Sequence, residues 1–339
     1  MTPTDAQSAA LDLTVSILSW NTRDLLRRCL GSIYHPAWPP VRAARERAGL
    51  PCDAVPEEIS FEVVVVDQES LDRSARMVAE EFPQVRLLAR KGNLGFAGGN
   101  NLAYQHARGR YFLLLNSDTV LRPGALTALV RFADAHPRAG LIGPKVLNPN
   151  GSLQLSCRRF PTLGAGLFRH TPLGILFPKN RFVRKYLMDD WTHDQPQEVD
   201  WLSGCCLLAR REMIEEIGLL DDGFFMYFED VDWAVRAHRA GWQVLYYPEP
   251  LVIHEIGRST DKAVKRMIVR HHLSAYRFFT KHYPSTRRPL VRGALIAGLA
   301  VRCALTLARN QALRWKLKWS QRKSAARKSR KLSEPRSGG

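Results

Sequence analysis

The sequence predicts an α/β fold built on a mainly parallel sheet and followed by a basic helical tail. Short runs rich in β-branched residues alternate with helical patterns over the first 145 residues, which is typical of right-handed βαβ units. The run at residues 61–67 is almost wholly apolar, as expected for a strand that helices cover on both faces. Apolar residues make up 45% of the 339-residue chain, which is enough for a buried core.

The elements of the first half follow from apolar spacing and turn residues. Apolar side chains from Leu25 to Ile33 recur at helical spacing, and Asn21 or Thr22 can cap that helix. Residues 35–60 are rich in proline and charge, which predicts a long loop or insertion. The pattern predicts strands at 13–20, 61–67, 85–89 and 111–116. It predicts one helix after residue 22, a second at 71–82, and a third that follows the glycine-rich turn at 92–100 and ends at about residue 107.

The second half is less regular, and residues 160–191 show no clean period. Strands are predicted at 200–209 and 242–247, and helices at 210–217 and 231–240. The composition changes after residue 284. We therefore expect an N-terminal extension at 1–12, a folded body at 13–284 with halves at about 13–146 and 147–284, and a basic tail at 285–339.

The positive charge is concentrated at the C-terminus. Residues 281–339 contain 16 Lys and Arg and one acid, Glu334, so they carry +15 of the formal net charge of +18. A near-neutral body with a basic tail indicates contact with an anionic surface, either membrane or nucleic acid. The six cysteines have no metal-type spacing, and residues 1–12 have no signal-peptide pattern, so we expect free thiols in a reducing cytosol.

Polar side chains follow three of the predicted strands. Trp20 and Asn21 come after the first strand, Asp67 comes after the second, and Asn116 and Asp118 come after the fourth. Each of these alone is a common helix or turn cap. Ligands of open α/β sheets bind at the carboxyl ends of strands, so the three positions together indicate a binding site.

The phosphate-binding motifs of other α/β folds are missing. The chain has no G-x-x-x-x-G-K-[ST] sequence, and residues 95–98 do not fit G-x-G-x-x-G, which disfavours P-loop NTPases and dinucleotide oxidoreductases. A nucleotide can be held instead through Mg2+ or Mn2+, which binds few carboxylates together with phosphate oxygens. Asn116 and Asp118 at a strand end suit that arrangement.

A second group of candidate residues lies at 224–232, where acids adjoin aromatic side chains. Glu229, Asp230 and Asp232 open a predicted helix, a position that favours acids as caps. The apolar neighbours raise the pKa of an adjacent carboxyl, which suits a general base. His254 follows a late strand. A lone His is more often a structural hydrogen-bonding residue, but beside a bound metal it would serve as a ligand.

Taken in order, these motifs resemble the family 2 glycosyltransferases of the GT-A fold, most closely the bacterial rhamnosyltransferase-like branch. Together they cover most of residues 13–260, and their joint occurrence is specific although no single one is. The matching segments are residues 15–21, 64–67, 93–100, 113–118, 218–232 and His254.

The resemblance implies an inverting, metal-dependent transfer of a sugar from a nucleoside diphosphate sugar to a cell-surface polysaccharide or lipid-linked acceptor, with rhamnose as the branch-level expectation. Asp230 matches the family's general base, and Glu229 and Asp232 are expected on the acceptor side. Asp118 and His254 match the ligands of Mg2+ or Mn2+. The residues that the resemblance places on the nucleotide sugar are Trp20, Asn21, Asp67, Asn93 and Asn116.

Two positions depart from the family pattern. Gln68 stands where the family usually has Asn after the strand-end Asp, and it reshapes the expected nucleotide contact. Asn116 occupies the first position of the DXD-like motif, as it often does in this branch.

The tail begins with a largely apolar stretch at residues 289–308, which as a helix is about 30 Å long. Arg302 lies within it, and a central Arg costs roughly 2.5–3.5 kcal/mol on insertion scales. Basic residues recur every seven positions from Arg302 to Lys323, beside Trp315 and Trp319. This pattern favours an amphipathic helix lying peripherally on the inner, cytoplasmic membrane face over a spanning helix.

Two other functions stay open from the sequence. A sugar-nucleotide nucleotidyltransferase has a similar fold, but its glycine- and arginine-rich loop after the first strand is missing at residues 20–23. A nucleic-acid-binding protein would use the basic tail, yet the body is near neutral and few aromatic residues are interleaved in the tail. The donor base, the acceptor, the linkage and the oligomeric state do not follow from the sequence.

Overall fold

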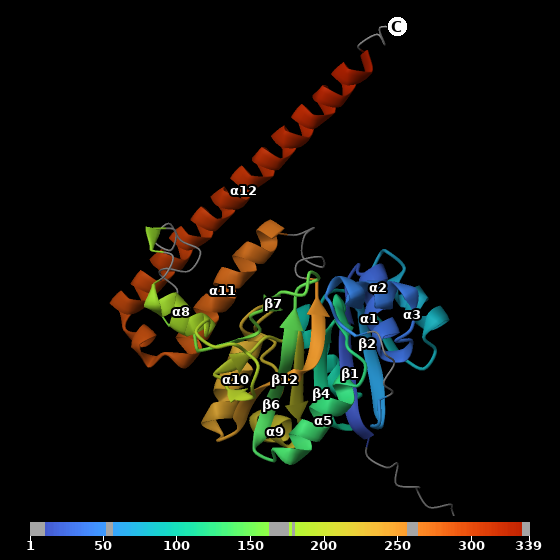
Figure 1. Cartoon of the computed structure of the whole chain (residues 1–339). Helices are drawn as coiled ribbons and strands as arrows, with labels where there is room; N and C mark the ends of the chain where they lie inside the picture. The colour runs from blue at the N-terminus through green and yellow to red at the C-terminus, as the bar shows by residue number, and fades with distance from the viewer. Residues whose placement is uncertain (1–10, 52–56, 163–175, 178–179, 256–263, 334–339) are drawn as a thin grey trace, which may run out of the picture.

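The computed structural model describes residues 11–51, 57–162, 176–177, 180–255 and 264–333, with side chains up to residue 316. A ten-stranded sheet forms the centre, and helices cover both of its faces (Figure 1). Its main path has the order β3-β2-β1-β4-β11-β6-β12-β5. The strands of the described chain are β1 (Leu11–Ser19), β2 (Phe61–Gln68), β3 (Arg86–Arg90), β4 (Gly109–Asn116), β5 (Thr119–Leu121), β6 (Ala139–Leu147), β7 (Leu153–Gln154), β8 (Cys157–Arg158), β9 (Gln197–Glu198), β10 (Trp201–Leu202), β11 (Cys206–Arg210) and β12 (Gln243–His254). Strands β8 and β10 pair with each other in a separate two-stranded sheet, and the other ten form the central sheet.

The helices of the body lie between these strands in sequence, which confirms the predicted α/β class. They are α1 (Arg23–Tyr34), α2 (Pro39–Arg47), α3 (Ser74–Glu81), α4 (Gly95–Tyr104), α5 (Ala125–Ala135), α8 (Arg181–Leu187), α9 (Arg211–Ile217), α10 (Glu229–Arg239) and α11 (Val264–His282). A short 3-10 turn, η2 (Pro284–Arg287), connects α11 to the long helix α12 (Pro289–Ser333).

The first four strands of the path are parallel, which brings their carboxyl ends to one edge of the sheet. Ser19 is paired with Asp67, and Leu18 is paired with Asn116, so the predicted strand-end residues start from adjacent positions. β11 runs antiparallel to both β4 and β6, and β12 runs parallel to β6. The sheet is therefore mixed and mostly parallel, and it continues through both predicted halves of the body.

The core consists of two main layers, one on each face of the sheet. Val64 and Val66 of β2 pack into one layer, and Val63 and Val65 pack into the other. This confirms the prediction that β2 is covered on both faces, because successive strand residues point to opposite sides. Helices α4, α9, α10 and α11 contribute to the first layer, and α1, α3 and α5 contribute to the second.

Several predicted elements differ from the structure. The segment at 35–60 contains α2, held by Arg45, whose buried guanidinium donates hydrogen bonds to the carbonyl oxygens of Leu121 and Pro36. The glycine-rich turn is shorter than predicted because α4 begins at Gly95. The predicted strand at 200–209 is divided into β10 and β11, and β12 extends seven residues further than predicted, to His254.

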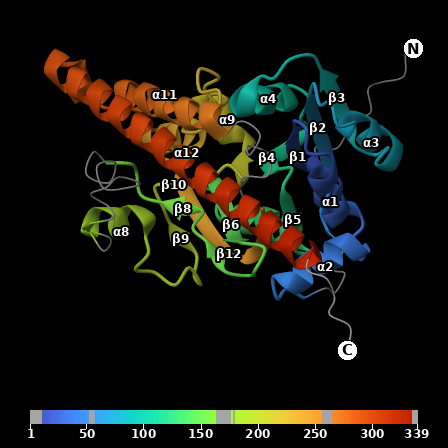
Figure 2. The same cartoon turned by 90° about the horizontal axis from the view of Figure 1, so that it is seen from above.

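The predicted cap of α1 is also wrong. Neither Asn21 nor Thr22 caps this helix with its side chain; the Arg23 N–H instead donates to the Asp72 carboxylate at 2.8 Å. Helix α11, which had no predicted counterpart, lies beside the start of α12 (Figures 1 and 2). From there α12 projects away from the body as one long helix, and its path crosses over the sheet when viewed from above (Figure 2).

Candidate active site

Two adjoining cavities lie at the carboxyl edge of the sheet. The strand-end cavity has a volume of about 340 Å³, and the α10 cavity has a volume of about 480 Å³. Four residues line both of them: Phe96, Asn116, Asp118 and Met226. The two cavities therefore meet at the DXD-like position.

The structure brings three of the predicted nucleotide-sugar residues and one predicted metal ligand, Asp118, to the cavities. Trp20, Asn93, Asn116 and Asp118 line the strand-end cavity. The Asn93 side-chain oxygen accepts a hydrogen bond from the N–H of Gly95 at 2.7 Å, which fixes the turn into α4. These residues come from three loops that the parallel strands place side by side.

Asn21 and Asp67 do not line the strand-end cavity. Asn21 has a positive φ of 58°, and its side-chain oxygen accepts a hydrogen bond from the N–H of Leu71 at 2.8 Å, so it holds the loop after β2. Asp67 is buried; its Oδ1 accepts from the N–H of Ser70, while its Oδ2 has no hydrogen-bond partner among the described residues. The roles of Asn21 and Asp67 in nucleoside binding therefore stay predictions.

Gln68 lines the strand-end cavity and also organises it. Its side-chain oxygen accepts a hydrogen bond from the N–H of Leu94 at 2.8 Å, directly before α4. Gly95 then approaches the backbone of Phe225, and a Cβ at Gly95 would lie 2.1 Å from the Phe225 carbonyl oxygen. The next N–H, that of Phe96, donates to the same oxygen at 2.8 Å. Only glycine fits there, because φ is +75° and the backbones touch.

Asp118 and His254 lie together at the junction of the cavities. The His254 Nε2 is 3.2 Å from Asp118 Oδ1 and 3.4 Å from Asn116 Nδ2. The His254 Nδ1–H donates to Gln154 Oε1 at 2.7 Å, which leaves Nε2 facing Asp118. Burial opposes the charge on His254, but Cys205 and Asp118 favour it and raise its pKa to about 10.

This donor set fits a divalent cation. Asp118 supplies a carboxylate, His254 an oriented imidazole nitrogen, and Asn116 an amide oxygen when its side chain is rotated. Among the residues that the structure describes, no group of three or more His, Cys, Asp or Glu side chains is placed to hold a metal. Mg2+ or Mn2+ needs only a few protein ligands when diphosphate oxygens occupy other positions of its coordination shell.

Asp230 and Glu229 line the α10 cavity at the start of α10. One oxygen of Asp230 accepts a hydrogen bond from the N–H of Gly204 at 3.1 Å, and the other accepts from the N–H of Val231 at 2.9 Å. Burial raises the pKa of Asp230. Burial and the Asp230 charge raise the pKa of Glu229 well above its usual range, and its Oε2 has no hydrogen-bond partner among the described residues.

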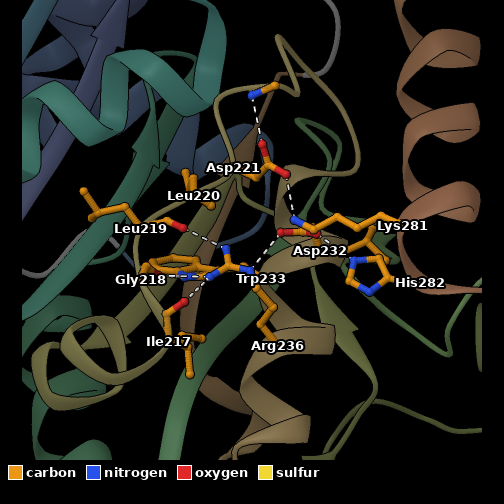
Figure 3. A network of polar contacts seen from close by, with 12 residues as sticks. Ile217, Gly218, Leu219, Leu220, Asp221, Asp232, Trp233, Arg236, Lys281 and His282 are labelled. Carbon is orange, nitrogen blue, oxygen red and sulfur yellow. Dashed lines mark hydrogen bonds and ion pairs between the residues drawn. The ribbon is translucent and has the colours of Figure 1, made fainter.

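Asp232, which was expected on the acceptor side, does not line the α10 cavity. Its fully buried carboxylate contacts Arg236 at 2.9 Å, Lys281 at 2.7 Å and His282 at 2.6 Å (Figure 3). Two residues along an α-helix correspond to a rotation of about 200°, so Asp232 points away from the cavity that Asp230 faces. Burial opposes its charge, but hydrogen bonds from His282, Lys281 and Arg236 lower its pKa to about 2.

The sequence patterns missed several lining residues. Arg266, Met267 and Arg270 of α11 line the strand-end cavity, and Arg270 lies 4.8 Å from the Phe225 ring centre. Gln154, which orients His254, and Arg158 line the α10 cavity. The spacing of Arg266 and Arg270 by four residues on a helix was the only local signal for these two.

Comparison with known proteins identifies the family. Residues 53–269 match the family model described as "Glycosyltransferase like family 2". The chain belongs to glycosyltransferase family 2. The predicted resemblance is thereby confirmed, and neither the nucleotidyltransferase nor the nucleic-acid-binding alternative is supported.

Relatives and a solved structure agree with this assignment. The chain is 32% identical over 256 residues to N-acetylglucosaminyl-diphospho-decaprenol L-rhamnosyltransferase of Mycobacterium tuberculosis, covering 72% of this chain and 82% of the relative. It is 26% identical over 198 residues to rhamnosyltransferase WbbL of Escherichia coli K12, covering 56% of this chain and 72% of the relative. A crystal structure of GalNAc-T7 with UDP, GalNAc and Mn2+ superposes with a TM-score of 0.51 at 17% identity, over 74% of this chain and 44% of that one. This likeness supports the GT-A fold.

Proposed function

We propose that this glycosyltransferase moves rhamnose, with inversion, from a nucleoside diphosphate rhamnose to a lipid-linked acceptor at the membrane. The observation that carries the proposal is the junction of two cavities at Asp118, with Asp230 in the second cavity. The names of the two bacterial relatives support rhamnose, and the name of the mycobacterial one supports a lipid-linked acceptor.

The strand-end cavity is the donor site in this proposal. Trp20 offers a ring to the nucleobase. Asp67 lies near the end of the adjacent strand β2, opposite Ser19, and its Oδ2, which has no partner among the described residues, calls for a donor such as a base N–H. Asn93 lies beside the glycine-rich segment that approaches the nucleotide. Arg266 and Arg270 supply two positive charges to the diphosphate from the α11 side.

Asp118 and His254 would hold Mg2+ or Mn2+, with Asn116 beside them. When bound, the cation supplies positive charge to the diphosphate leaving group. Gln154 keeps His254 in the tautomer with a free Nε2, and Asn148 orients Gln154 by accepting a hydrogen bond from its Nε2 at 3.1 Å.

Asp230 is the general base. It accepts the proton of the acceptor hydroxyl while that oxygen bonds to the anomeric carbon of the donor, and the bond from that carbon to the diphosphate oxygen breaks with its electron pair. One displacement inverts the anomeric configuration, and no covalent enzyme intermediate is required. Burial and the charge of Asp230 raise the pKa of Glu229, which favours a single negative charge on the pair, and this proposal places that charge on Asp230.

Helix α12 is the proposed membrane contact. Among the described residues, its segment Pro289–Lys316 is long and apolar enough to cross a membrane; its most apolar 18-residue window has a mean hydropathy of 1.7, and 6% of that window is buried in the protein. Exposed apolar side chains recur on it, among them Leu290, Ile296, Val301, Leu305 and Trp315. We propose that this surface binds the anionic inner leaflet of the cytoplasmic membrane.

Packing of α12 on the body favours the interfacial arrangement over the spanning one. Leu295 packs against the core layer, and the Arg292 Nε–H donates to the Tyr276 hydroxyl at 2.8 Å. Side chains at Arg302 and Thr306 remain half-buried. Arg302 lies within the apolar stretch at residues 289–308, and a central Arg costs roughly 2.5–3.5 kcal/mol on insertion scales.

The test is transfer from nucleoside diphosphate rhamnose donors to a short-chain N-acetylglucosaminyl diphosphate lipid with Mn2+, followed by NMR of the product. We expect a rhamnosylated lipid whose anomeric configuration is opposite to that of the donor. A product with the donor's configuration would refute inversion. Transfer of other sugars but not rhamnose would refute the donor assignment while leaving the family unaffected.

A further inference from the structure

Arg158 is a cation inside the α10 cavity that no step above uses. It ends β8, and its guanidinium lies 5.1 Å from the Trp201 ring centre and 6.0 Å from the Tyr186 ring centre. One of its terminal N–H groups donates to the carbonyl oxygen of Leu155 at 3.2 Å. Its Nε is buried and has no hydrogen-bond partner among the described residues. A buried donor without an acceptor calls for a ligand atom.

The local strand geometry directs this side chain into the cavity. Cys157, the residue before it, is fully buried in the core layer. Arg159, the residue after it, forms an ion pair with Asp200 at 3.0 Å and does not line the cavity. Successive strand residues point to opposite sides, so of these two adjacent arginines only Arg158 faces Asp230 and Glu229.

Arg158 is not neutralised by an ion pair with any carboxylate that the structure describes. It is close enough to Asp230 for its charge to favour the ionised base, against the effect of burial. A guanidinium held between aromatic rings near the base is a prepared site for an anion, because its planar donors match phosphate oxygens.

We propose that Arg158 binds the phosphate group that links the acceptor sugar to its lipid, while a hydroxyl of the same sugar reaches Asp230. This inference rests on the proposed function and names the acceptor class: a sugar that carries a phosphate or diphosphate at its reducing end. Arg158 is thus a substrate-binding residue on the acceptor side, distinct from Arg266 and Arg270 in the donor cavity.

The surroundings of Arg158 agree with a lipid-linked phosphate. Tyr186 of α8, which flanks the guanidinium, is close enough to Arg302 of α12 for the two side chains to interact electrostatically. The phosphate end of the acceptor would therefore lie on the α12 side of the cavity. A lipid attached there leads toward the helix that carries the exposed apolar side chains.

The experiment compares two acceptors that share one sugar, a short-chain isoprenyl diphosphate glycoside and a neutral alkyl glycoside. For Arg158→Gln we expect kcat/KM to fall by roughly 10- to 100-fold with the diphosphate acceptor and by less than about 3-fold with the neutral one. Arg158→Lys should recover part of the loss, since it keeps the charge but not the planar donors. Arg159→Gln, the adjacent control, should leave the ratio between the two acceptors unchanged.

An equal loss with both acceptors would mean that Arg158 acts on Asp230 rather than on the phosphate, and it would overturn the inference. No loss with either acceptor would overturn it as well. A binding measurement separates the inference from the proposed function: a short-chain isoprenyl diphosphate is titrated into protein saturated with nucleoside diphosphate and Mn2+. Wild type should bind it and Arg158→Gln should bind it at least about 10-fold more weakly, whichever sugar is transferred. Equal binding by the two proteins overturns the inference.

Discussion

Replacing Asp230 by Asn separates the chemical role of this carboxylate from its structural role. The carboxylate accepts hydrogen bonds from the N–H groups of Gly204 and Val231. Asn retains one acceptor oxygen and nearly the same volume, but its amide NH2 then faces one of these two N–H groups. A lost hydrogen bond to a charged group costs roughly 1.5–3 kcal/mol.

Removal of the buried charge offsets part of that cost. Burial raises the pKa of Asp230, so the ionised form is disfavoured in the folded state, and a neutral side chain avoids this penalty. We therefore expect a net loss of about 0–2 kcal/mol in the free energy of unfolding. At roughly 2–4 °C per kcal/mol, Tm should fall by less than about 8 °C.

The loss of activity should be much larger. Asn does not accept the acceptor's proton, so kcat should fall by about 10²–10⁴-fold. Donor Kd should change little, because Asp230 lines the α10 cavity and not the strand-end cavity. The assay measures kcat, donor Kd and Tm for wild type and Asp230→Asn. Near-normal turnover together with a lowered Tm would refute the base assignment and leave Asp230 as a helix cap.

Four further outcomes follow from the same geometry. Asp232→Asn should mainly lower stability, with donor Kd retained and about 2 kcal/mol of the free energy of unfolding lost at pH 7. The reason is that the Asp232 pKa of about 2 stabilises the fold above pH 4, and this contribution disappears as the pH falls toward 2. Urea unfolding at pH 7 and pH 3 measures the loss, and an unchanged pH dependence would contradict the ion-pair assignment. Asp118→Ala should abolish Mn2+-dependent nucleoside diphosphate binding in calorimetry while the circular dichroism spectrum is retained, and Mn2+-dependent binding that survives would exclude Asp118 as a ligand. Arg270→Gln should weaken nucleoside diphosphate binding by roughly 10-fold, whereas Lys265→Gln, which removes the same charge from the same helix at a position outside the cavity, should not; equal effects would indicate only long-range charge. The double variant Val301→Glu with Leu305→Glu, at exposed positions of α12, should float less with anionic vesicles than wild type, and unchanged flotation would contradict membrane binding through this face.

The sequence predicted the strand ends well because burial imposes a strong local pattern. Four consecutive valines in β2 require cover on both faces, and parallel pairing then places Trp20, Asn116 and Asp118 at one edge. Asp230 was found in the same way, from the apolar segment before it, and the structure places it in a cavity.

Residues whose roles depend on tertiary packing were not predicted. Asp232 looked equivalent to Asp230 in the sequence, but the rotation of α10 and the position of His282, 50 residues later, decide its direction. Arg266 and Arg270 read as ordinary charges in a basic region, and only the packing of α11 beside the sheet edge brings them to the donor cavity. Gln154 reaches His254 from a strand exactly one hundred residues earlier, and no local pattern encodes that contact.

The placement of α11 has a mechanical consequence. Its first turns present Arg266 and Arg270 to one cavity and His271 to the other, its last turn holds Asp232 of α10 through Lys281 and His282, and η2 then joins it to α12. In the proposed membrane-bound state, a tilt of α12 on the lipid surface would move α11 as well. The movement of α11 would shift Arg266 and Arg270 relative to Asp118, and through Asp232 it would displace α10, which carries Asp230. Lipid composition and bilayer curvature would then act on turnover directly, in addition to concentrating the enzyme near its acceptor.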